Sequence, residues 1–182
     1  MKTDLSLYNN SWYSPGGNLI KRILWYFFNI MVMKNAWLPT SGLKVRILRT
    51  FGAKIGIGVN IKPCVNIKYP WLLEIEDYTW IGENVWIDNL AEVKIGSNVC
   101  ISQGAMLLCG NHNYKKTTFD LMVGKITLED GCWIGAQSTV CPGVTVHSHA
   151  VLGVASVANR DLEPYTIYQG NPAQIIRKRI IV

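Results

Sequence analysis

The sequence predicts an all-β fold, a parallel β-solenoid with three flat sides, and three observations support this prediction. First, an aliphatic residue recurs every six positions, and a small residue follows most of them four positions later. A period of six fits neither a helix nor a simple alternating strand, but it fits a coil whose short sides point residues i and i+4 inward. The aliphatic series consists of Ile55, Ile61, Ile67, Ile75, Ile81, Ile87, Ile95, Ile101, Leu107, Leu128, Ile134, Val140, Val146 and Leu152.

Second, the spacing lengthens twice in the same way. The step is eight residues from Ile67 to Ile75 and again from Ile87 to Ile95, each time after three repeats. Two extra residues therefore lie at the same corner of successive turns. This regularity indicates three strands per turn, with neighbouring turns stacked as parallel strands about 4.8 Å apart.

Third, the repeat is interrupted once, between Leu107 and Leu128. We expect a loop at about residues 110–126 to protrude from a corner of the coil. A loop of this length is uncommon in a compact fold unless it has a function. The solenoid itself, of about five coils, is expected at residues 54–182.

Residues 1–53 have a different pattern, which predicts a helical cap. A helix is expected from Asn18 to Trp37, and a second, basic amphipathic helix from Leu43 to Phe51. The apolar residues with helical spacing in the first helix are Leu19, Ile23, Leu24, Phe27, Phe28 and Met31. The basic residues of the second helix are Lys44, Arg46 and Arg49.

These helices allow two interpretations. In the first, they cover the first coil and hide its open strand edges. In the second, residues 18–51 contact a membrane surface peripherally, where lipid-linked sugars reside. The apolar run from Ile23 to Met33 is too short to cross a bilayer, which takes about 20 residues. Amphipathic helices usually face a core, which favours the cap.

Composition indicates one well-packed cytoplasmic protein. Of the 182 residues, 49% are hydrophobic and only 16% are charged, which is typical of a well-filled core. The net charge of +6 suits an anionic ligand such as a phosphorylated cofactor, and we expect no nucleic-acid partner. The five cysteines form no CxxC pair and are expected to be reduced thiols. The polar N-terminus does not have the pattern of a cleavable signal peptide.

His112 is the histidine with the most suggestive position. It lies in the segment Gly110-Asn111-His112-Asn113-Tyr114 at the start of the protruding loop, so its side chain is expected to project from a corner. An imidazole has an unperturbed pKa of about 6.5, so it can accept a hydroxyl proton near neutral pH. We therefore predict that His112 is a general base.

Several motifs resemble those of the hexapeptide-repeat acyltransferases, and in particular the exopolysaccharide O-acetyltransferases of the colanic-acid type. The resemblance covers most of residues 55–178. The matching motifs are the GNHNY segment at 110–114, Trp133-Ile134-Gly135, Pro142 to Thr145, Tyr168 to Ala173, and the stretches 85–90 and 98–105. The left hand of the β-helix is inferred from this resemblance alone.

The resemblance implies an activity. The family transfers acetyl from acetyl-CoA to a sugar hydroxyl without a covalent enzyme intermediate, and its loop histidine matches His112. In the galactoside group of the family, a side-chain amide one coil earlier positions that histidine or the acceptor. The matching residue here is Asp88, a departure in type. A carboxylate could orient the imidazole as in a His–Asp pair, although Asp is also common in turns.

The family also implies a homotrimer with active sites between subunits and the pantetheine arm of acetyl-CoA in a groove between two prisms. Small residues in this groove would allow the cofactor to approach closely, and arginines would bind its phosphates. The matching residues are Trp133, Gly135, Ala136, Gly153, Val154, Asn159, Arg160 and Arg177. The expected acceptor contacts are Asn89, Asn111 and Tyr114. Trp80 and Trp86 occupy outward positions and are expected at a subunit interface.

Three alternatives remain open from the sequence. The acceptor could be an amino sugar or serine instead of a saccharide hydroxyl, and a lipid-linked acceptor is equally compatible with the motifs. A zinc protein like the gamma-class carbonic anhydrases is a second alternative, but His147 and His149 lie on different turns from His112, so we expect no metal. A non-enzymatic hexapeptide scaffold is the third, and His112 within a long loop argues against it.

Overall fold

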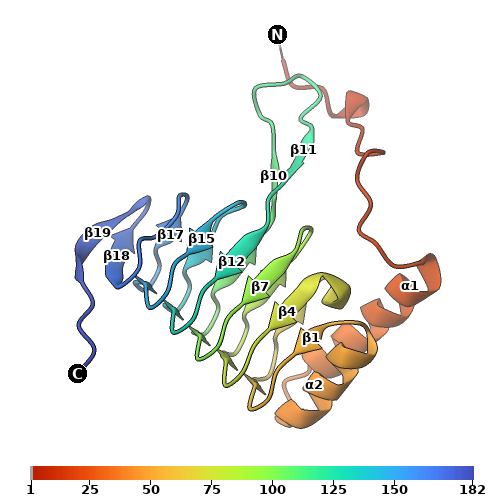
Figure 1. Ribbon diagram of the computed structural model, residues 1–182. Helices are drawn as coiled ribbons and strands as arrows, with labels where there is room; N and C mark the ends of the chain where they lie inside the picture. Colours follow the sequence, from red (N-terminus) through yellow and green to blue (C-terminus); the bar gives the residue numbers. More distant parts are fainter. Residues whose placement is uncertain (1) are drawn as a thin grey trace.

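The computed structural model describes residues 2–182, and within residues 54–182 parallel strands stack into a three-sided prism whose last strand runs antiparallel to its neighbour (Figure 1). Each turn contributes one strand to each of three sheets, here called A, B and C. Sheet A contains β1 (Lys54–Ile55), β4 (Leu73–Ile75), β7 (Val93–Ile95), β12 (Ile126–Leu128) and β15 (Thr145–Val146). Sheet B contains β2 (Asn60–Ile61), β5 (Trp80–Ile81), β8 (Cys100–Ile101), β13 (Trp133–Ile134), β16 (Val151–Leu152), β18 (Thr166–Gly170) and β19 (Ala173–Lys178). Sheet C contains β3 (Asn66–Ile67), β6 (Trp86–Asp88), β9 (Met106–Leu108), β14 (Thr139–Val140) and β17 (Val157–Ala158).

The strands stack in register, so that equivalent aliphatic residues lie above one another. In sheet A, Ile75 pairs with Ile55 on one side and with Ile95 on the other. Five turns are complete, and β18 together with a bridge between Val146 and Leu162 begins a sixth. The repeated aliphatic side chains are buried and form one continuous core along the prism axis. The predicted β-solenoid and its three strands per turn are confirmed.

The glycines that follow the aliphatic positions are required by the stacking of turns. A side-chain carbon at Gly82 would lie 2.9 Å from a backbone oxygen of the next turn, and one at Gly135 would lie 2.7 Å from the Leu152 oxygen. Both distances are shorter than van der Waals contact, so only glycine fits. The left-handed backbone conformation that a tight corner needs falls instead on other residues, such as Asn84 and Gln137.

The N-terminal region contains four short helical segments, and a fifth lies on the second turn of the prism. They are the 3-10 turn η1 (Leu5–Leu7), α1 (Leu19–Phe28), the π-helical η2 (Asn29–Met33), α2 (Ser41–Thr50) and the 3-10 turn η3 (Pro70–Leu72). Asn18 caps α1 by accepting the backbone N–H of Lys21 at 2.8 Å. Helical structure continues through η2 but ends before Trp37, the end expected from the sequence. Within residues 2–182, no helix is long and apolar enough to cross a bilayer.

The helices cover the open end of the first turn through hydrogen bonds to its strand edges. Arg49 Nη2 donates to the last carbonyl of β1 at 2.7 Å. Lys44, which is fully buried, donates to the last carbonyl of β2 at 3.4 Å and to the following carbonyl at 2.8 Å. Trp25 Nε1 donates to the last carbonyl of β3 at 2.9 Å. Ser41 and Asn29 add further hydrogen bonds to the edges of β2 and β3. Because every sheet edge of the first turn is bonded to a side chain of the N-terminal region, the contacts are those of a cap.

The face of α1 that meets the prism differs from the expected one. Of the six apolar residues with helical spacing, only Phe28 packs against the core. The others are exposed, for example Leu19 at 61% and Phe27 at 53%, whereas Trp25 and Met33 are buried. The helix is anchored by an aromatic and polar face, since hydrogen bonds to strand edges require donors. A wide apolar stripe is therefore left open to solvent.

The interruption of the repeat forms an antiparallel hairpin that stands out from the prism (Figure 1). Its strands are β10 (Gly110–His112) and β11 (Leu121–Val123), with His112 opposite Leu121. The predicted protruding loop is thus confirmed and has regular structure at its base.

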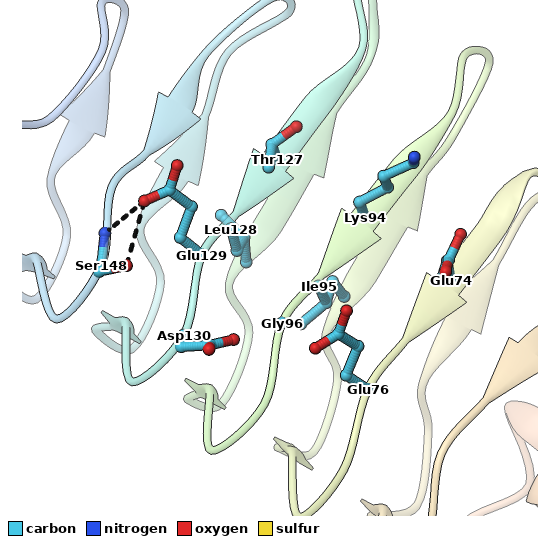
Figure 2. A pocket seen from close by; sticks show the side chains of 10 residues that line it. All are labelled: Glu74, Glu76, Lys94, Ile95, Gly96, Thr127, Leu128, Glu129, Asp130 and Ser148. Atoms are coloured by element: carbon cyan, nitrogen blue, oxygen red, sulfur yellow. Dashed lines mark hydrogen bonds between the residues drawn. The ribbon is translucent and has the colours of Figure 1, made fainter.

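The outer faces of the three sheets differ in polarity. Sheet A presents charged and hydroxyl side chains around a shallow hollow, shown in Figure 2. Glu129 in this hollow accepts the backbone N–H of Ser148 at 2.8 Å. Sheets B and C instead expose tryptophans, with Trp80 at 62%, Trp86 at 39% and Trp133 at 47%. None of the residues that line the hollow on sheet A is a site residue expected from the sequence.

Candidate active site

The hairpin leaves the prism at the corner between sheets C and A, directly after the last residue of β9 and the buried Cys109. Asp88 ends β6 and pairs with that last residue of β9, so it lies at the base of the hairpin on the preceding turn. A side-chain carbon at Gly110 would lie 3.9 Å from Asp88 Oδ2 and would collide with Leu90. Glycine at this position leaves room for the Leu90 side chain, and the Asp88 carboxylate lies next to the base of the hairpin. We call residues 88–90 and 108–112 the hairpin corner.

His112 is held on the hairpin by contacts on both sides of its ring. Its Nδ1 lies 3.0 Å from the carbonyl oxygen of Phe119. A carbonyl can only accept, so in the neutral ring Nδ1 carries the proton and Nε2 keeps its lone pair. The ring stacks on that of Phe119 with centroids 4.4 Å apart and 8° between planes, and Tyr8 packs nearby at 5.8 Å. The arrangement fixes the tautomer in which Nε2 can act as a base.

Asp88 is a buried carboxylate whose charge is balanced by a lysine. It is 7% exposed, and Lys68 Nζ lies 2.9 Å from its Oδ1. Among residues 2–182, Oδ1 has no hydrogen-bond partner of good geometry. The expected His–Asp pair is not formed within this chain, because His112 Nδ1 is already directed at the carbonyl of Phe119.

The N-terminal segment, residues 2–17, runs from the tip of the hairpin to α1 (Figure 1). The backbone N–H of Asp4 donates to a carbonyl of the hairpin turn at 2.9 Å, and Tyr13 Oη donates to the carbonyl of Leu90 at 2.7 Å. Burial raises the pKa of Tyr13 well above its ordinary value of about 10, and neighbouring acidic groups such as Asp88 add to the effect. The phenol therefore remains a hydrogen-bond donor and is no base at neutral pH.

Burial keeps three of the five cysteines in the protonated thiol form. Burial raises the pKa of Cys109 to about 11 and that of Cys132 to about 12, and it also raises the pKa of Cys141. The thiolate is the nucleophilic form of cysteine. None of these three residues is therefore activated to accept an acyl group.

The residues expected to bind the cofactor fall into two groups that lie apart on the prism. Trp133, Gly135 and Ala136, with Gly153 and Val154 on the next turn, lie where sheet B passes into sheet C. Trp133 Nε1 donates to Ser102 Oγ at 2.9 Å. Asn159 and Arg160 follow β17 at the other end of sheet C, the corner from which the hairpin also leaves. Arg160 Nη2 donates to Gln174 Oε1 at 2.6 Å, and Arg177 is exposed on β19. One chain therefore does not join the two groups into a single site.

The three expected acceptor contacts also lie in different environments. Asn89 is fully buried, and its side chain donates to and accepts from the backbone of Tyr69 at 2.6 and 2.9 Å. The oxygen and the nitrogen of the Asn89 side-chain amide are thus both hydrogen-bonded, and they join two turns of the prism. Asn111 and Tyr114 are exposed on the hairpin, and Asn111 Oδ1 accepts the backbone N–H of His112 at 2.8 Å.

The other two histidines lie on a different corner from His112. His147 Nδ1 is 3.0 Å from Glu129 Oε1, and the ring of His149 stacks on Tyr165 with centroids 4.7 Å apart. Across residues 2–182, no three His, Cys, Asp or Glu side chains are grouped so that they could hold a metal ion.

Sequence reasoning did not identify the partners of the site residues, namely Phe119, Lys68, Tyr8 and Tyr13. Phe119 could have been found from a hairpin pairing, since an antiparallel hairpin over residues 110–126 brings its two strands together near His112. The contacts of Lys68, Tyr8 and Tyr13 join segments distant in sequence, and no local pattern marks them.

Comparison with known proteins places the chain in a family. It is 38% identical over 167 residues to a protein of Escherichia coli (strain K12) assigned as the colanic acid biosynthesis acetyltransferase WcaF, and the match covers 91% of each chain. It is 27% identical over 150 residues to the galactoside O-acetyltransferase of the same organism, covering 81% of this chain and 63% of the relative. No family model matches the sequence.

A crystal structure shows the same fold. The hexapeptide-repeat acetyltransferase of Vibrio cholerae O1 biovar eltor, solved as a complex with acetyl coenzyme A, superimposes with a TM-score of 0.79 at 22% identity. The match covers 89% of this chain and 88% of that one. The chain belongs to the hexapeptide-repeat acetyltransferases, a family of acyltransferases built on the left-handed parallel β-helix.

Proposed function

We propose that this enzyme transfers acetyl from acetyl-CoA to a hydroxyl of a saccharide unit in exopolysaccharide biosynthesis. One observation carries the proposal: Nδ1–H of His112 donates a hydrogen bond to the carbonyl of Phe119, which leaves the lone pair on Nε2 as a base on an exposed hairpin. The similarity to WcaF over 91% of the chain supports a saccharide acceptor, and the galactoside O-acetyltransferase supports a hydroxyl as the acetylated group. Acetyl-CoA is the donor, as in the Vibrio cholerae complex.

The proposed reaction is a direct transfer. Nε2 of His112 accepts the hydroxyl proton while the sugar oxygen attacks the thioester carbonyl carbon. The resulting oxyanion collapses, the carbon–sulfur bond breaks, and the CoA thiolate takes the proton from the imidazolium. The raised pKa values of Cys109, Cys132 and Cys141 favour this route over an acyl-cysteine intermediate.

The positive ring that forms during transfer is stabilised by the Phe119 carbonyl, which accepts from Nδ1 throughout. Asp88 adds a negative charge at the base of the same hairpin, and we assign it an electrostatic role, with Lys68 setting its position. Holding acceptor and donor beside one another supplies much of the remaining rate enhancement.

A homotrimer is part of the proposal. The two groups of cofactor residues lie at opposite ends of the sheet C strands, so a cofactor that contacts both needs two chains. The exposed tryptophans of sheet B, Trp80 and Trp133, are typical of subunit interfaces, whereas the outer face of sheet A is charged. Each active site would then combine the hairpin corner of one chain with the corner of the next chain at which sheet B passes into sheet C.

Contact with an anionic membrane surface is a further part. The apolar stripe of α1 is exposed, and residues 5–73 contain nine lysines and arginines and no acidic residue. Apolar and basic groups together suit the cytoplasmic leaflet, whose surface is negatively charged. Sedimentation with phosphatidylglycerol vesicles tests this, and binding should weaken in Ile23→Ser/Phe27→Ser. Equal sedimentation of wild type and variant, or none with either, would contradict the contact.

The central test measures thiol release from acetyl-CoA with a panel of neutral sugars, amino sugars, serine and lipid-linked oligosaccharides. We expect release that depends on a saccharide and falls by about 100- to 10,000-fold in His112→Ala, the range for loss of a general base. His147→Ala is the matched control, because this histidine lies on another corner, and it should retain full activity. Full activity of a trimeric His112→Ala, or a preference for serine, would refute the proposal.

A further inference from the structure

A groove of about 470 Å³ lies between the N-terminal helices and the outer edge of sheet C. It is lined by aromatic and basic side chains, and no acidic residue is among the lining residues. The lining residues are Arg22, Trp25, Tyr26, Asn29, Ile30, Lys34, Asn66, Lys68, Tyr69 and Trp86. The groove contains none of the cofactor residues expected from the sequence.

The basic side chains of the groove are largely uncompensated. Lys68 is paired with Asp88. Across residues 2–182, Arg22 and Lys34 have no side-chain hydrogen bond and no carboxylate within ion-pair distance. Arg22 is partly buried as a residue, and arginines that leave solvent are normally paired with an anion. Two free cations on one wall are suited to an anion with several oxygens, such as a phosphate.

The aromatic walls are held rigidly. The Trp25 indole is fixed by its bond to the end of β3, and Tyr69 stacks on Trp71 with centroids 5.3 Å apart. Trp86 occupies the outward position of β6 and remains 39% exposed, so its face is available in the groove. Flat apolar faces beside cations suit a sugar ring that carries a charged substituent.

The groove leads to the predicted active site. Lys68 lines the groove and contacts the Asp88 carboxylate at 2.9 Å, and Asp88 lies at the base of the hairpin that carries His112. A ligand seated in the groove would therefore extend toward the hairpin corner.

We infer that this groove binds the phosphate end of a sugar diphosphate acceptor, with Arg22 and Lys34 on the phosphates and Trp86 against the sugar. The inference rests on the proposed function and names the chemical class of its acceptor. The diphosphate could be esterified to a lipid or to a nucleoside. Tyr26 and Ile30 line the groove and are also exposed beside the apolar stripe of α1, so a lipid chain could continue from the groove onto that stripe.

The test is calorimetric binding of UDP-glucose and of glucose to the full-length protein without acetyl-CoA. We expect UDP-glucose to bind, with an affinity that falls as salt rises, and glucose to bind far more weakly. Arg22→Gln/Lys34→Gln should weaken binding of UDP-glucose by about tenfold or more, because charge-assisted hydrogen bonds are lost. Lys94→Gln/Lys125→Gln, two exposed lysines elsewhere on the prism, is the matched control and should bind as the wild type does.

A single charge reversal, Lys34→Glu, protects the test against misfolding, because Lys34 is exposed. Undecaprenyl diphosphate in phosphatidylcholine vesicles tests for the lipid ester. If the wild type binds these vesicles and Lys34→Glu does not, the ligand is the lipid ester. If Lys34→Glu loses only the binding of UDP-glucose, the ligand is the nucleoside ester. The inference is overturned if neither diphosphate binds, or if the groove variants and the control bind equally. If the inference is overturned but acetyl transfer to neutral sugars is unchanged, the proposed function still stands. If a diphosphate binds but no acetyl transfer is found with any acceptor, the proposed function alone is rejected.

Discussion

Sheets A and C have matching inner faces and contrasting outer faces. Ile95 on sheet A and Ile87 on sheet C are both fully buried at equivalent positions of the repeat. Outside, sheet A carries ion pairs such as Lys54 with Glu74 at 3.2 Å, while sheet C carries Trp86 and borders the groove and the hairpin corner. The repeat therefore specifies the prism, and the outward positions specify what each face contacts.

This contrast has a physical basis. Inner side chains all pack in the same narrow space, so selection for volume is uniform around the prism. Outer positions contribute little to packing and can vary with function. A charged face remains in solvent at little cost, whereas exposed tryptophans and unpaired cations indicate ligands or partner chains.

The largest expected effect concerns the inner faces. Ile87→Ala and Ile95→Ala should each destabilise the protein by about 2–5 kcal/mol, because both delete buried methyl groups from a continuous core. Urea denaturation followed by circular dichroism measures the free energy of unfolding. A loss on one sheet several times that on the other would break the equivalence of the inner faces.

The second prediction concerns the outer faces in assembly. In the proposed trimer Trp80 of sheet B lies at the interface, so Trp80→Glu should raise the dissociation constant of that trimer by about tenfold or more. Thr127→Glu on sheet A is the control and should leave the trimer unchanged. Analytical ultracentrifugation over a range of concentrations would detect the difference. A stable trimer in Trp80→Glu would show that sheet B faces solvent.

The third prediction concerns cofactor binding and compares the corner at which sheet B passes into sheet C with the outer face of sheet A. Val154 is 60% exposed, so Val154→Asp should fold normally. Its carboxylate would repel the phosphates of acetyl-CoA and raise the KM for acetyl-CoA by about tenfold, which corresponds to about 1.4 kcal/mol. Thr145→Asp on sheet A should have no such effect. An unchanged KM in Val154→Asp would remove this residue from the cofactor groove.

The smallest effect concerns the cap. Burial lowers the pKa of the Lys44 ammonium, so in the folded protein this group releases its proton at lower pH than in the unfolded chain. Between these two pKa values the unfolded state binds more protons, so stability rises with pH there, toward about 10.4. The stability of the wild type relative to Lys44→Met should therefore increase as pH approaches 10, by at most about 1.4 kcal/mol per pH unit. If the stability difference between the wild type and Lys44→Met stayed constant or fell as the pH rises, the lowered pKa of Lys44 would be contradicted.

Several features could be predicted from residues alone because they depend on local spacing. The two eight-residue steps indicated three strands per turn, and the interruption after Leu107 located the protruding segment that forms the hairpin. His112 was identified because it stands outside the repeat. Gly135 was expected to let the cofactor approach, and the structure shows that the next turn of the prism also requires a glycine there.

Other features depended on distant contacts and could not be predicted. The apolar stripe of α1 was expected to face the core, but strand edges need donors, so Trp25 faces the prism instead. Asp88 was expected beside His112, but the hairpin closes so that Phe119 takes that place. Asn89 was expected at the acceptor, but its amide joins two turns of the prism.

The sequence by itself determined the three-sided coil, the number of strands per turn and the position of His112 on the protruding segment, because a repeat is a property of neighbouring residues and the same short geometry recurs with each copy. Only the tertiary structure decided the proton position on His112, the pairing of Asp88 with Lys68 and the basic groove beside α1. Each of these features joins segments that are separated in the sequence, by as few as seven residues or by more than forty. Hydrogen bonds and ion pairs depend on distance and direction in space, which the order of residues does not reveal.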